Sequence, residues 1–199
     1  FYNELLYIMG VEEVTEDKVK KIKRLKTKRQ PYSLVEQAIS HLDGYDLYEE
    51  QAIFDTALGL VLNWTNRLLF LKLLESQLLA FNKGAFSKFL TISIIPDYDV
   101  LNDLFMKVLA VPVDHREDEF RETFKDVPYL NSSLFEKSAM EKKFFPISGI
   151  RLGSMEVMNQ TAIKDNNGKR FKGSLSTLDY LFRFLDAFDF GIEKQGADR

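Results

Sequence analysis

The sequence contains no cysteine, which excludes disulfides, thiolate chemistry and cysteine-based zinc sites. Its only histidines, His41 and His115, lie far apart in the chain, so a histidine-rich metal site is not expected. The lack of disulfides fits a reducing compartment, and we expect a cytoplasmic protein. No secretory signal peptide is visible, and the chain opens at Phe1 with residues typical of a core helix. We therefore expect a piece of a longer protein.

Neither sign of charge dominates, because the formal net charge is only −3 over 199 residues. Composition alone therefore does not indicate a nucleic-acid partner. Hydrophobic residues make up 45% of the chain, and 17 phenylalanines among them are enough for a sizeable core. The longest apolar stretch, residues 57–74, contains Asn63, Asn66, Arg67 and Lys72. These side chains would be costly in lipid, so we expect neither a membrane span nor a membrane partner.

The hydrophobic pattern predicts a mainly α-helical fold, a helical bundle around one long buried helix. That helix is expected from about Leu47 to Phe81 and to be buried on nearly all of its faces, because most of them are apolar. A short helix over residues 1–9 is expected to end at Gly10. Another, over residues 34–42, is expected to be capped by Ser33 with Glu36 completing a capping box.

Shorter elements are expected in the rest of the chain. They are an amphipathic element over 86–95, a helix capped by Asp97 or Asp99 and running to Ala110, one helical turn around Glu119, and a charged helix over 136–143. The Asp-Asn-Asn-Gly sequence at 165–168 predicts a small β-hairpin in the C-terminal third, from about Met155 to Lys172. Ser174 is expected to cap a last helix over Thr177–Phe188.

A dense basic run between Lys18 and Arg29 is the strongest candidate for binding. Several cations within a dozen residues can neutralise phosphates, mostly without reading base sequence. The residues expected to contact DNA are Lys20, Lys21, Lys23, Arg24, Lys26, Lys28 and Arg29. The alternative is a solvated loop or helix face, because charge runs are often only surface. The sequence leaves these two interpretations open.

Several segments, taken in order, resemble the type IIG restriction-modification enzymes, which cut and methylate DNA in one polypeptide. They are Phe1–Gly10, Asn63–Glu75, Leu101–Phe105, Val127–Glu136 and Phe184–Phe190. The resemblance covers most of the chain and is specific as an ordered set, while each segment alone is weak. One departure is Ser132-Ser133, where many members of that family carry Gly-Gly, whose bare backbone these serines do not offer.

The resemblance implies a domain order of nuclease, helical connector, adenine-N6 methyltransferase and target-recognition domain. Residues 1–136 would then be the connector, and residues 137–199 the lead-in to the methyltransferase domain. The implied partners are double-stranded DNA and the neighbouring nuclease and methyltransferase domains, and the parent bacterial enzyme would use S-adenosylmethionine and Mg²⁺. The alternative function is a helical protein-interaction or regulatory domain with no DNA role.

Neither catalytic unit is expected within this chain, and no catalytic, cofactor-binding or metal-binding residue is predicted. A methyltransferase needs a glycine-rich loop and an Asn-Pro-Pro-Tyr-like motif, and both are missing. Asp97 with Glu141-Lys142-Lys143 matches the letters of a nuclease motif, but Glu141 falls in a charged helix, so we attribute the match to chance. Asp97, Asp99 and Asp103 are interpreted as helix-capping and first-turn charges.

Two further polar features are expected to be structural. A buried Arg67 needs an anionic partner, and Glu75 lies about two turns away, so we expect another segment to supply it. The segment Asn131-Ser132-Ser133 is typical of a turn followed by a helix cap.

Overall fold

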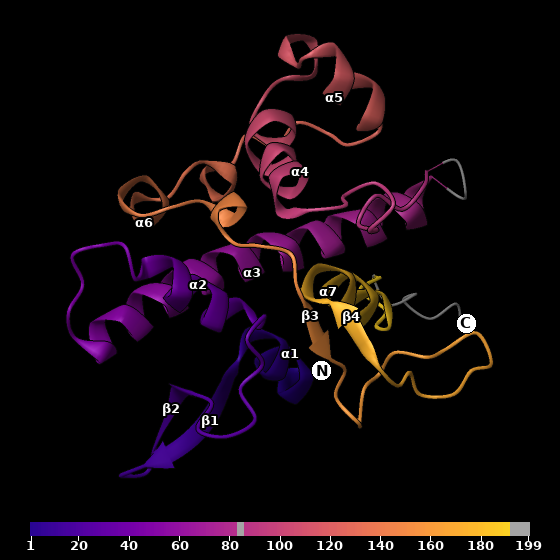
Figure 1. Cartoon of the computed structure of the whole chain (residues 1–199). Coiled ribbons are helices and arrows are strands. Elements are labelled where there is room, and N and C mark those ends of the chain that lie inside the picture. The colour runs from indigo at the N-terminus through magenta and orange to yellow at the C-terminus, as the bar shows by residue number, and fades with distance from the viewer. Residues whose placement is uncertain (83–85, 192–199) are drawn as a thin grey trace.

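The computed structural model describes residues 1–82 and 86–191, and the fold is mainly helical (Figure 1). The helices are α1 (Tyr2–Met9), α2 (Leu34–Leu42), α3 (Glu50–Phe81), α4 (Tyr98–Asp103), α5 (Asp118–Thr123), α6 (Ala139–Lys143) and α7 (Thr177–Asp186). Short turns of π- or 3₁₀-helix are η1 (Leu104–Leu109), η2 (Val113–His115), η3 (Ser133–Phe135) and η4 (Ile147–Gly149). Two antiparallel strand pairs join β1 (Val11–Glu16) to β2 (Val19–Arg24), and β3 (Ser154–Glu156) to β4 (Ser174–Ser176).

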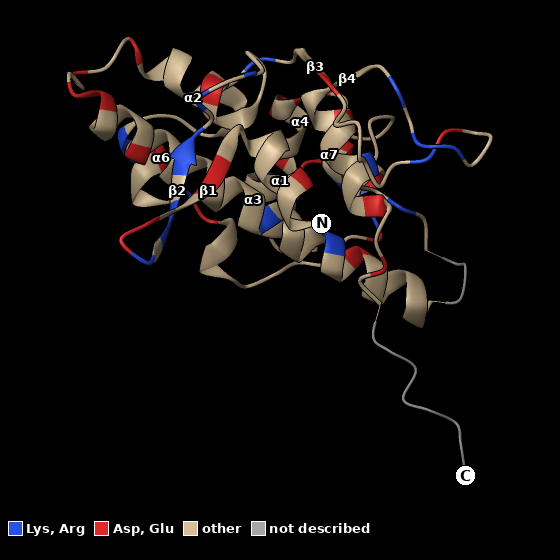
Figure 2. Ribbon diagram, turned by 90° about the horizontal axis from the view of Figure 1, so that it is seen from below, with Lys and Arg blue, Asp and Glu red and all other residues tan. Residues whose placement is uncertain are grey.

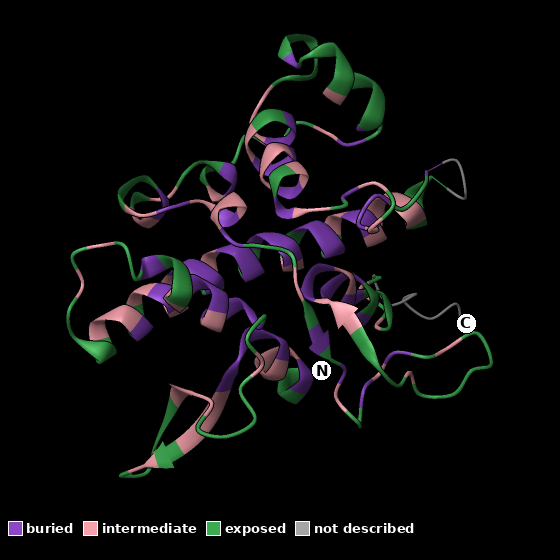
Figure 3. Ribbon diagram, viewed as in Figure 1, coloured by how far each residue is buried: buried purple, intermediate pink, exposed green. Residues whose placement is uncertain are grey.

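The long helix α3 is the centre of the bundle, and the other elements pack around it (Figure 1). Trp64, Leu68 and Leu71 are buried along its inner side, and Figure 3 shows the buried residues following α3 and the inner faces of α2 and α7. The prediction of one long central helix is confirmed. The expectation that nearly all of its faces are buried is wrong, because Leu62 and Phe70 lie on a stripe exposed to solvent.

By length and composition, α3 is the one helix in residues 1–82 and 86–191 that is long and apolar enough to cross a membrane. Half of its most apolar window is buried inside the chain. The helix also carries Arg67, Lys72 and Glu75, which are all buried and hydrogen-bonded. Ion pairs of this kind fit a protein interior better than lipid.

Helix α1 ends where its sequence predicts. Gly10 adopts the left-handed conformation (φ 87°), and its amide donates to the carbonyls of Leu6 and Tyr7. A Cβ at this position would lie 2.3 Å from Ser33 Oγ, so glycine is required both by the backbone angle and by the close packing of α2.

Several predicted caps and boundaries need correction. Ser33 precedes α2, but its hydroxyl makes no capping hydrogen bond, and Glu36 binds Arg24 instead of completing a capping box. Ser176, rather than Ser174, caps α7 by accepting from the Asp179 amide. Asp97 caps α4 as expected, and the predicted helix to Ala110 continues from α4 as the π-helical η1.

The segment over 86–95 is not a regular helix, although its pattern is amphipathic. Glu75 of α3 accepts hydrogen bonds from the backbone amides of Phe89 and Leu90, at 2.7 and 2.8 Å. Those amides are therefore satisfied by a side chain rather than by helix carbonyls.

Residues Val19–Arg24 of the basic run form the second strand of a β-hairpin that the sequence pattern did not predict, and residues 25–29 follow it outside the strand. Asp17 and Lys18 form its two-residue turn, with φ of 51° and 66°, as in a type I′ hairpin turn. The predicted C-terminal hairpin is confirmed in outline. Its paired strands, β3 and β4, are separated by a longer stretch of sequence than expected. An isolated bridge joins Lys164 to Arg170 beside the predicted turn.

The first and last parts of the described chain pack together. Glu4 of α1 is buried and accepts hydrogen bonds from Thr161, from the Ala162 amide and from Tyr180 of α7, which are 157 to 176 positions away. Phe1 stacks on Phe184 with ring centroids 5.1 Å apart. These contacts cross residue 136, and the division proposed there stays a prediction.

Candidate nucleic-acid interface

The hairpin β1–β2 extends from the helical body with opposite charges on its two strands (Figures 1 and 2). The acidic strand β1 carries Glu12, Glu13 and Glu16, and it pairs with the basic strand β2. Between residues 11 and 29 there are eight basic and four acidic residues, so the segment keeps a positive charge in a chain that is acidic as a whole. This local excess is the electrostatic feature that a phosphate backbone would meet.

Three of the seven candidate residues are engaged by glutamates of the hairpin itself. Lys20 Nζ lies 2.8 Å from Glu13, while Lys21 and Lys23 both contact Glu16. The hydrogen bond from Lys20 lowers the pKa of Glu13, and that from Lys23 lowers the pKa of Glu16, so both carboxylates are ionised at neutral pH. These pairs are solvent-exposed, and exposed pairs contribute little, so a competing phosphate can replace the carboxylate.

Arg24 has a different role, because it fastens the hairpin to the helices. Its guanidinium donates to both oxygens of Glu36 in α2, at 2.7 and 2.6 Å, and lies 3.8 Å from Glu50 at the start of α3. The hydrogen bond with Glu36 raises the pKa of Arg24 despite partial burial. A bidentate, half-buried pair is not readily exchanged for a phosphate.

The other three candidates follow β2 in an exposed segment. Within the part of the chain that the structure describes, no carboxylate lies within 4.0 Å of the amines of Lys26 or Lys28. Arg29 donates from Nε to the carbonyl of Leu25, which leaves its outer nitrogens toward solvent. Lys26, Lys28 and Arg29 are thus the members of the run best placed to meet an external anion.

The hairpin itself was detectable in principle from charge complementarity. Val11 and Val14 are three positions apart, as are Val19 and Ile22, which places each pair on opposite faces of its strand. That spacing hides the period of two that marks a strand. An acidic segment followed directly by a basic one was the available signal, because opposite charges stabilise cross-strand pairs.

The residues that match a nuclease motif in the sequence, Asp97 and Glu141, have separate structural partners. Glu141 of α6 is buried and paired with Arg67, while Asp97 caps α4 through the Val100 amide. Asp103 contacts Lys107 on the next turn. In residues 1–82 and 86–191 there is no group of three His, Cys, Asp or Glu side chains placed to hold a metal ion.

Arg67 has an anionic partner from another segment, as expected. That partner is Glu141, 74 positions further along the chain. Arg67 donates to both oxygens of that carboxylate, at 2.6 and 2.8 Å, and also to the carbonyls of Leu134 and Glu136. Burial alone raises the pKa of Glu141, but the bonds from Arg67 and Ser138 outweigh this effect and leave its pKa below the ordinary value. Arg67 therefore anchors the 134–141 segment to α3.

The segment Asn131-Ser132-Ser133 forms the turn and cap that its sequence predicts. Ser132 precedes η3, and its hydroxyl accepts from the Leu134 amide. The fold therefore accommodates side chains at Ser132 and Ser133, where many type IIG enzymes carry glycine.

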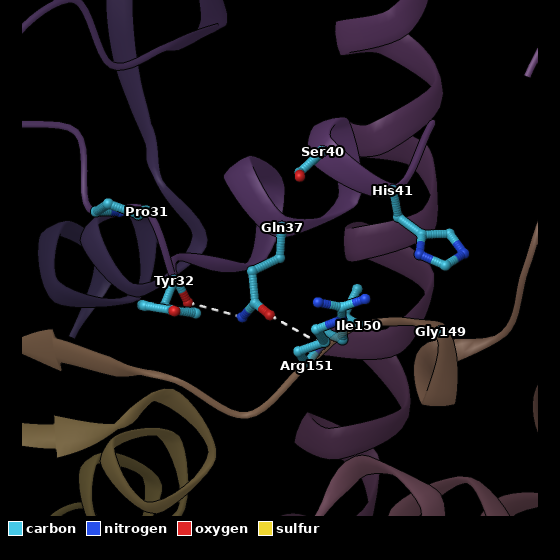
Figure 4. A pocket seen from close by; sticks show the side chains of 8 residues that line it. All are labelled: Pro31, Tyr32, Gln37, Ser40, His41, Gly149, Ile150 and Arg151. Carbon is cyan, nitrogen blue, oxygen red and sulfur yellow. Dashed lines mark hydrogen bonds between the residues drawn. The ribbon is translucent and has the colours of Figure 1, made fainter. Parts of the chain in front are cut away.

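One further cavity, of about 380 Å³, lies between α2 and the segment after η4 (Figure 4). Gln37 crosses it, donating to the Tyr32 carbonyl and accepting from the Arg151 amide. Its two polar ends are thereby satisfied, so this side chain ties two chain segments together rather than awaiting a ligand. His41 packs against Phe145 with centroids 4.2 Å apart.

Comparison with curated proteins and with solved structures found no match to this chain. A comparison with protein families found one model that matches residues 1–198, described as a domain of unknown function (DUF7814). Because that model spans nearly the whole sequence, the chain belongs to the DUF7814 family.

Proposed function

We propose that this chain is the non-catalytic helical connector of a bacterial type IIG restriction-modification enzyme, and that it contacts the DNA backbone while it holds the catalytic domains apart. The ordered resemblance to type IIG enzymes over most of the chain supports the proposed restriction-modification role. The observation that carries the DNA role is the exposed basic segment after β2, where Lys26, Lys28 and Arg29 follow a hairpin that extends from the helical body. Its contacts would be to phosphates and would carry little base specificity.

The helical body suits the proposed role of a rigid support. The bidentate pair of Arg24 with Glu36 fixes the hairpin to α2, and the buried Arg67–Glu141 pair fixes the 134–141 segment to α3. In the proposed enzyme, the nuclease and methyltransferase domains would flank this bundle. S-adenosylmethionine and Mg²⁺ would be bound by those neighbouring domains, in the cytoplasm.

The experiment compares the affinity for a short duplex over a range of salt concentrations. Variant K26Q/K28Q/R29Q is expected to weaken binding and to reduce the slope of log affinity against log salt by about one for each phosphate that is no longer neutralised, up to about three. Variant K20Q/K21Q/K23Q is expected to have a smaller effect, because those lysines are engaged by Glu13 and Glu16. Arg24 is left intact, since its removal would disturb the fold of the hairpin.

The DNA contact and the connector role are tested by different results. Unchanged binding by K26Q/K28Q/R29Q would reject the basic segment as a DNA contact. The connector role depends instead on the parent gene product, where nuclease residues should lie upstream, with a glycine-rich loop and an Asn-Pro-Pro-Tyr-like motif downstream. The absence of all of these would reject the restriction-modification assignment.

A protein-interaction domain with no DNA role is the second candidate, and the outer stripe of α3 favours it. Leu62, Phe70 and Leu73 are 39 to 45% exposed and lie on one face of the helix. Exposed apolar side chains gathered on one face are typical of protein interfaces. Absence of duplex binding at low salt, together with flanking sequences that lack both catalytic units, would favour this second function.

A further inference from the structure

The connection between β3 and β4 carries a second basic group of side chains, which is separate from the β1–β2 hairpin. The group, here called the basic tip, consists of Lys164, Lys169, Arg170 and Lys172, all of them exposed. Figure 1 shows this connection extending from the body on the opposite side from β1 and β2, and Figure 2 shows basic residues on both of its arms.

The turn at the end of the basic tip is fixed by its own hydrogen bonds. Asp165 Oδ1 accepts from the amides of Asn167 and Lys169, both at 2.9 Å, and Gly168 adopts a φ of 75°. The Gly168 amide also donates to the carbonyl of Asp165 at 3.0 Å. The cations therefore project from a defined turn. The carboxylate nearest to them in sequence is occupied by backbone amides.

Two of the cations lie directly opposite each other. Lys164 and Arg170 form an antiparallel bridge, flanked by the bonds Asp165 N to Lys169 O at 2.7 Å and Phe171 N to Ile163 O at 3.0 Å. In this arrangement the facing residues are not hydrogen-bonded to each other, so their Cα atoms are only about 4.5 Å apart and their side chains share one face. Like charges in such a pair are destabilising.

Among residues 1–82 and 86–191, no acidic oxygen lies within 4.0 Å of the amine or guanidinium nitrogens of the basic tip, so these cations form no direct ion pair there. Asp186 lines the same groove as Lys164, but it is already engaged by Lys72 and Lys88. The basic tip thus differs from strand β2, where Glu13 and Glu16 balance the lysines. A closely spaced pair of unbalanced cations on a fixed turn is suited to binding an external anion.

We propose that the basic tip binds phosphates of duplex DNA, as a second contact beside the segment after β2. This inference rests on the proposed DNA role and names a further surface for it. Several cations can meet adjacent backbone phosphates at once, and residues 164–170 are all polar or glycine. A membrane-binding loop would instead present apolar side chains, whereas Phe171 is half-buried against the core.

The test uses the whole chain and a fluorescent 20-base-pair duplex, with affinity measured between about 50 and 200 mM salt, the range over which phosphate contacts are most visible. Variant K164Q/K169Q/R170Q/K172Q removes the basic tip and leaves Asp165 and Gly168 to keep the turn. The matched control K125Q/K137Q/K142Q/K143Q removes the same number of exposed positive charges elsewhere. Circular dichroism verifies that both variants are folded.

The tip variant is expected to lose affinity at least about tenfold at low salt and to reduce the salt slope by two to four, about one for each phosphate that is no longer neutralised. The control variant should change both quantities much less. Equal effects of tip and control variants would overturn the basic tip as a site and indicate general charge attraction. Binding to phosphatidylserine vesicles that depends on the tip, without duplex binding, would also overturn it in favour of a membrane.

The outcomes separate this inference from the proposed function. A tip variant that binds like the wild type, beside a weakened K26Q/K28Q/R29Q variant, would reject the tip and keep the DNA role. The reverse pattern would keep the tip and reject the segment after β2. No duplex binding by the wild-type chain at low salt would reject both phosphate contacts, while the connector assignment would still be decided by the flanking sequences.

Discussion

Replacing Arg67 with Met tests the physical basis of the fold most severely, because it removes one partner of a fully buried ion pair. The side chains of Arg67 and Glu141 are both 0% exposed. In R67M the Glu141 carboxylate would keep the donors Trp64 Nε1, Asn63 Nδ2 and the Ser138 amide, but it would lose its counter-charge. The carbonyls of Leu134 and Glu136 would also lose a donor.

Breaking a buried pair in this way costs about 3–5 kcal/mol of the free energy of unfolding. For a domain of this size, 1 kcal/mol shifts Tm by about 2–4 °C, so R67M should melt about 6–20 °C below the wild type. The double variant R67M/E141Q should recover about 1–3 kcal/mol relative to R67M, because the buried charge is then removed with its partner. Both variants should keep a helical spectrum below their melting temperature.

Urea unfolding followed by circular dichroism measures these differences, with R183Q as the matched control, because Arg183 forms an exposed pair with Asp179. The control should lose no more than about 1 kcal/mol. A cost below about 1 kcal/mol for R67M, or a double variant that is no more stable than R67M, would refute the proposed role of this network.

The remaining predictions concern other packing contacts and acid stability. G10A should lower the free energy of unfolding by at least about 1–2 kcal/mol, because alanine disfavours the left-handed backbone and its Cβ would collide with Ser33. An unchanged melting temperature would reject this reasoning. Y180F should cost about 1–3 kcal/mol, since it removes the hydroxyl that bonds Glu4, and an unchanged Tm would contradict it. Because the pKa of Glu141 is lowered by folding, its contribution is present above its unfolded pKa of about 4.3 and is lost as pH falls through the folded pKa. The wild type should therefore lose more stability than E141Q on acidification below about pH 5, and parallel pH profiles would disprove the assignment.

The central helix and the need for a partner at Arg67 could be predicted from the sequence, because both depend on local pattern and on the cost of burying a charge. The identity of that partner could not be predicted. Glu141 reaches Arg67 only because residues 134–141 fold back over α3, with the capping box of Ser138 and Glu141 turning α6 into position. Such an interaction depends on tertiary arrangement, which no local period encodes.

The candidate interface was predictable as a basic segment but not as a set of available cations. Residue type gave equal weight to seven residues. In the folded chain, Glu13 contacts Lys20, Glu16 contacts Lys21 and Lys23, and Glu36 of α2 contacts Arg24. The basic tip was outside the sequence prediction for a related reason. Lys164 and Arg170 are six positions apart in the sequence, and only the bridge between them makes their charges adjacent.

The affinity of the unmodified chain for a generic duplex, measured across salt concentrations, tests the central claim most directly. The proposed phosphate contacts predict binding that is measurable at low salt and a slope of log affinity against log salt of about −3 or steeper, since each phosphate that is neutralised adds about −0.9. Binding that does not change with salt, or no binding at about 50 mM salt, would contradict a DNA-contacting connector.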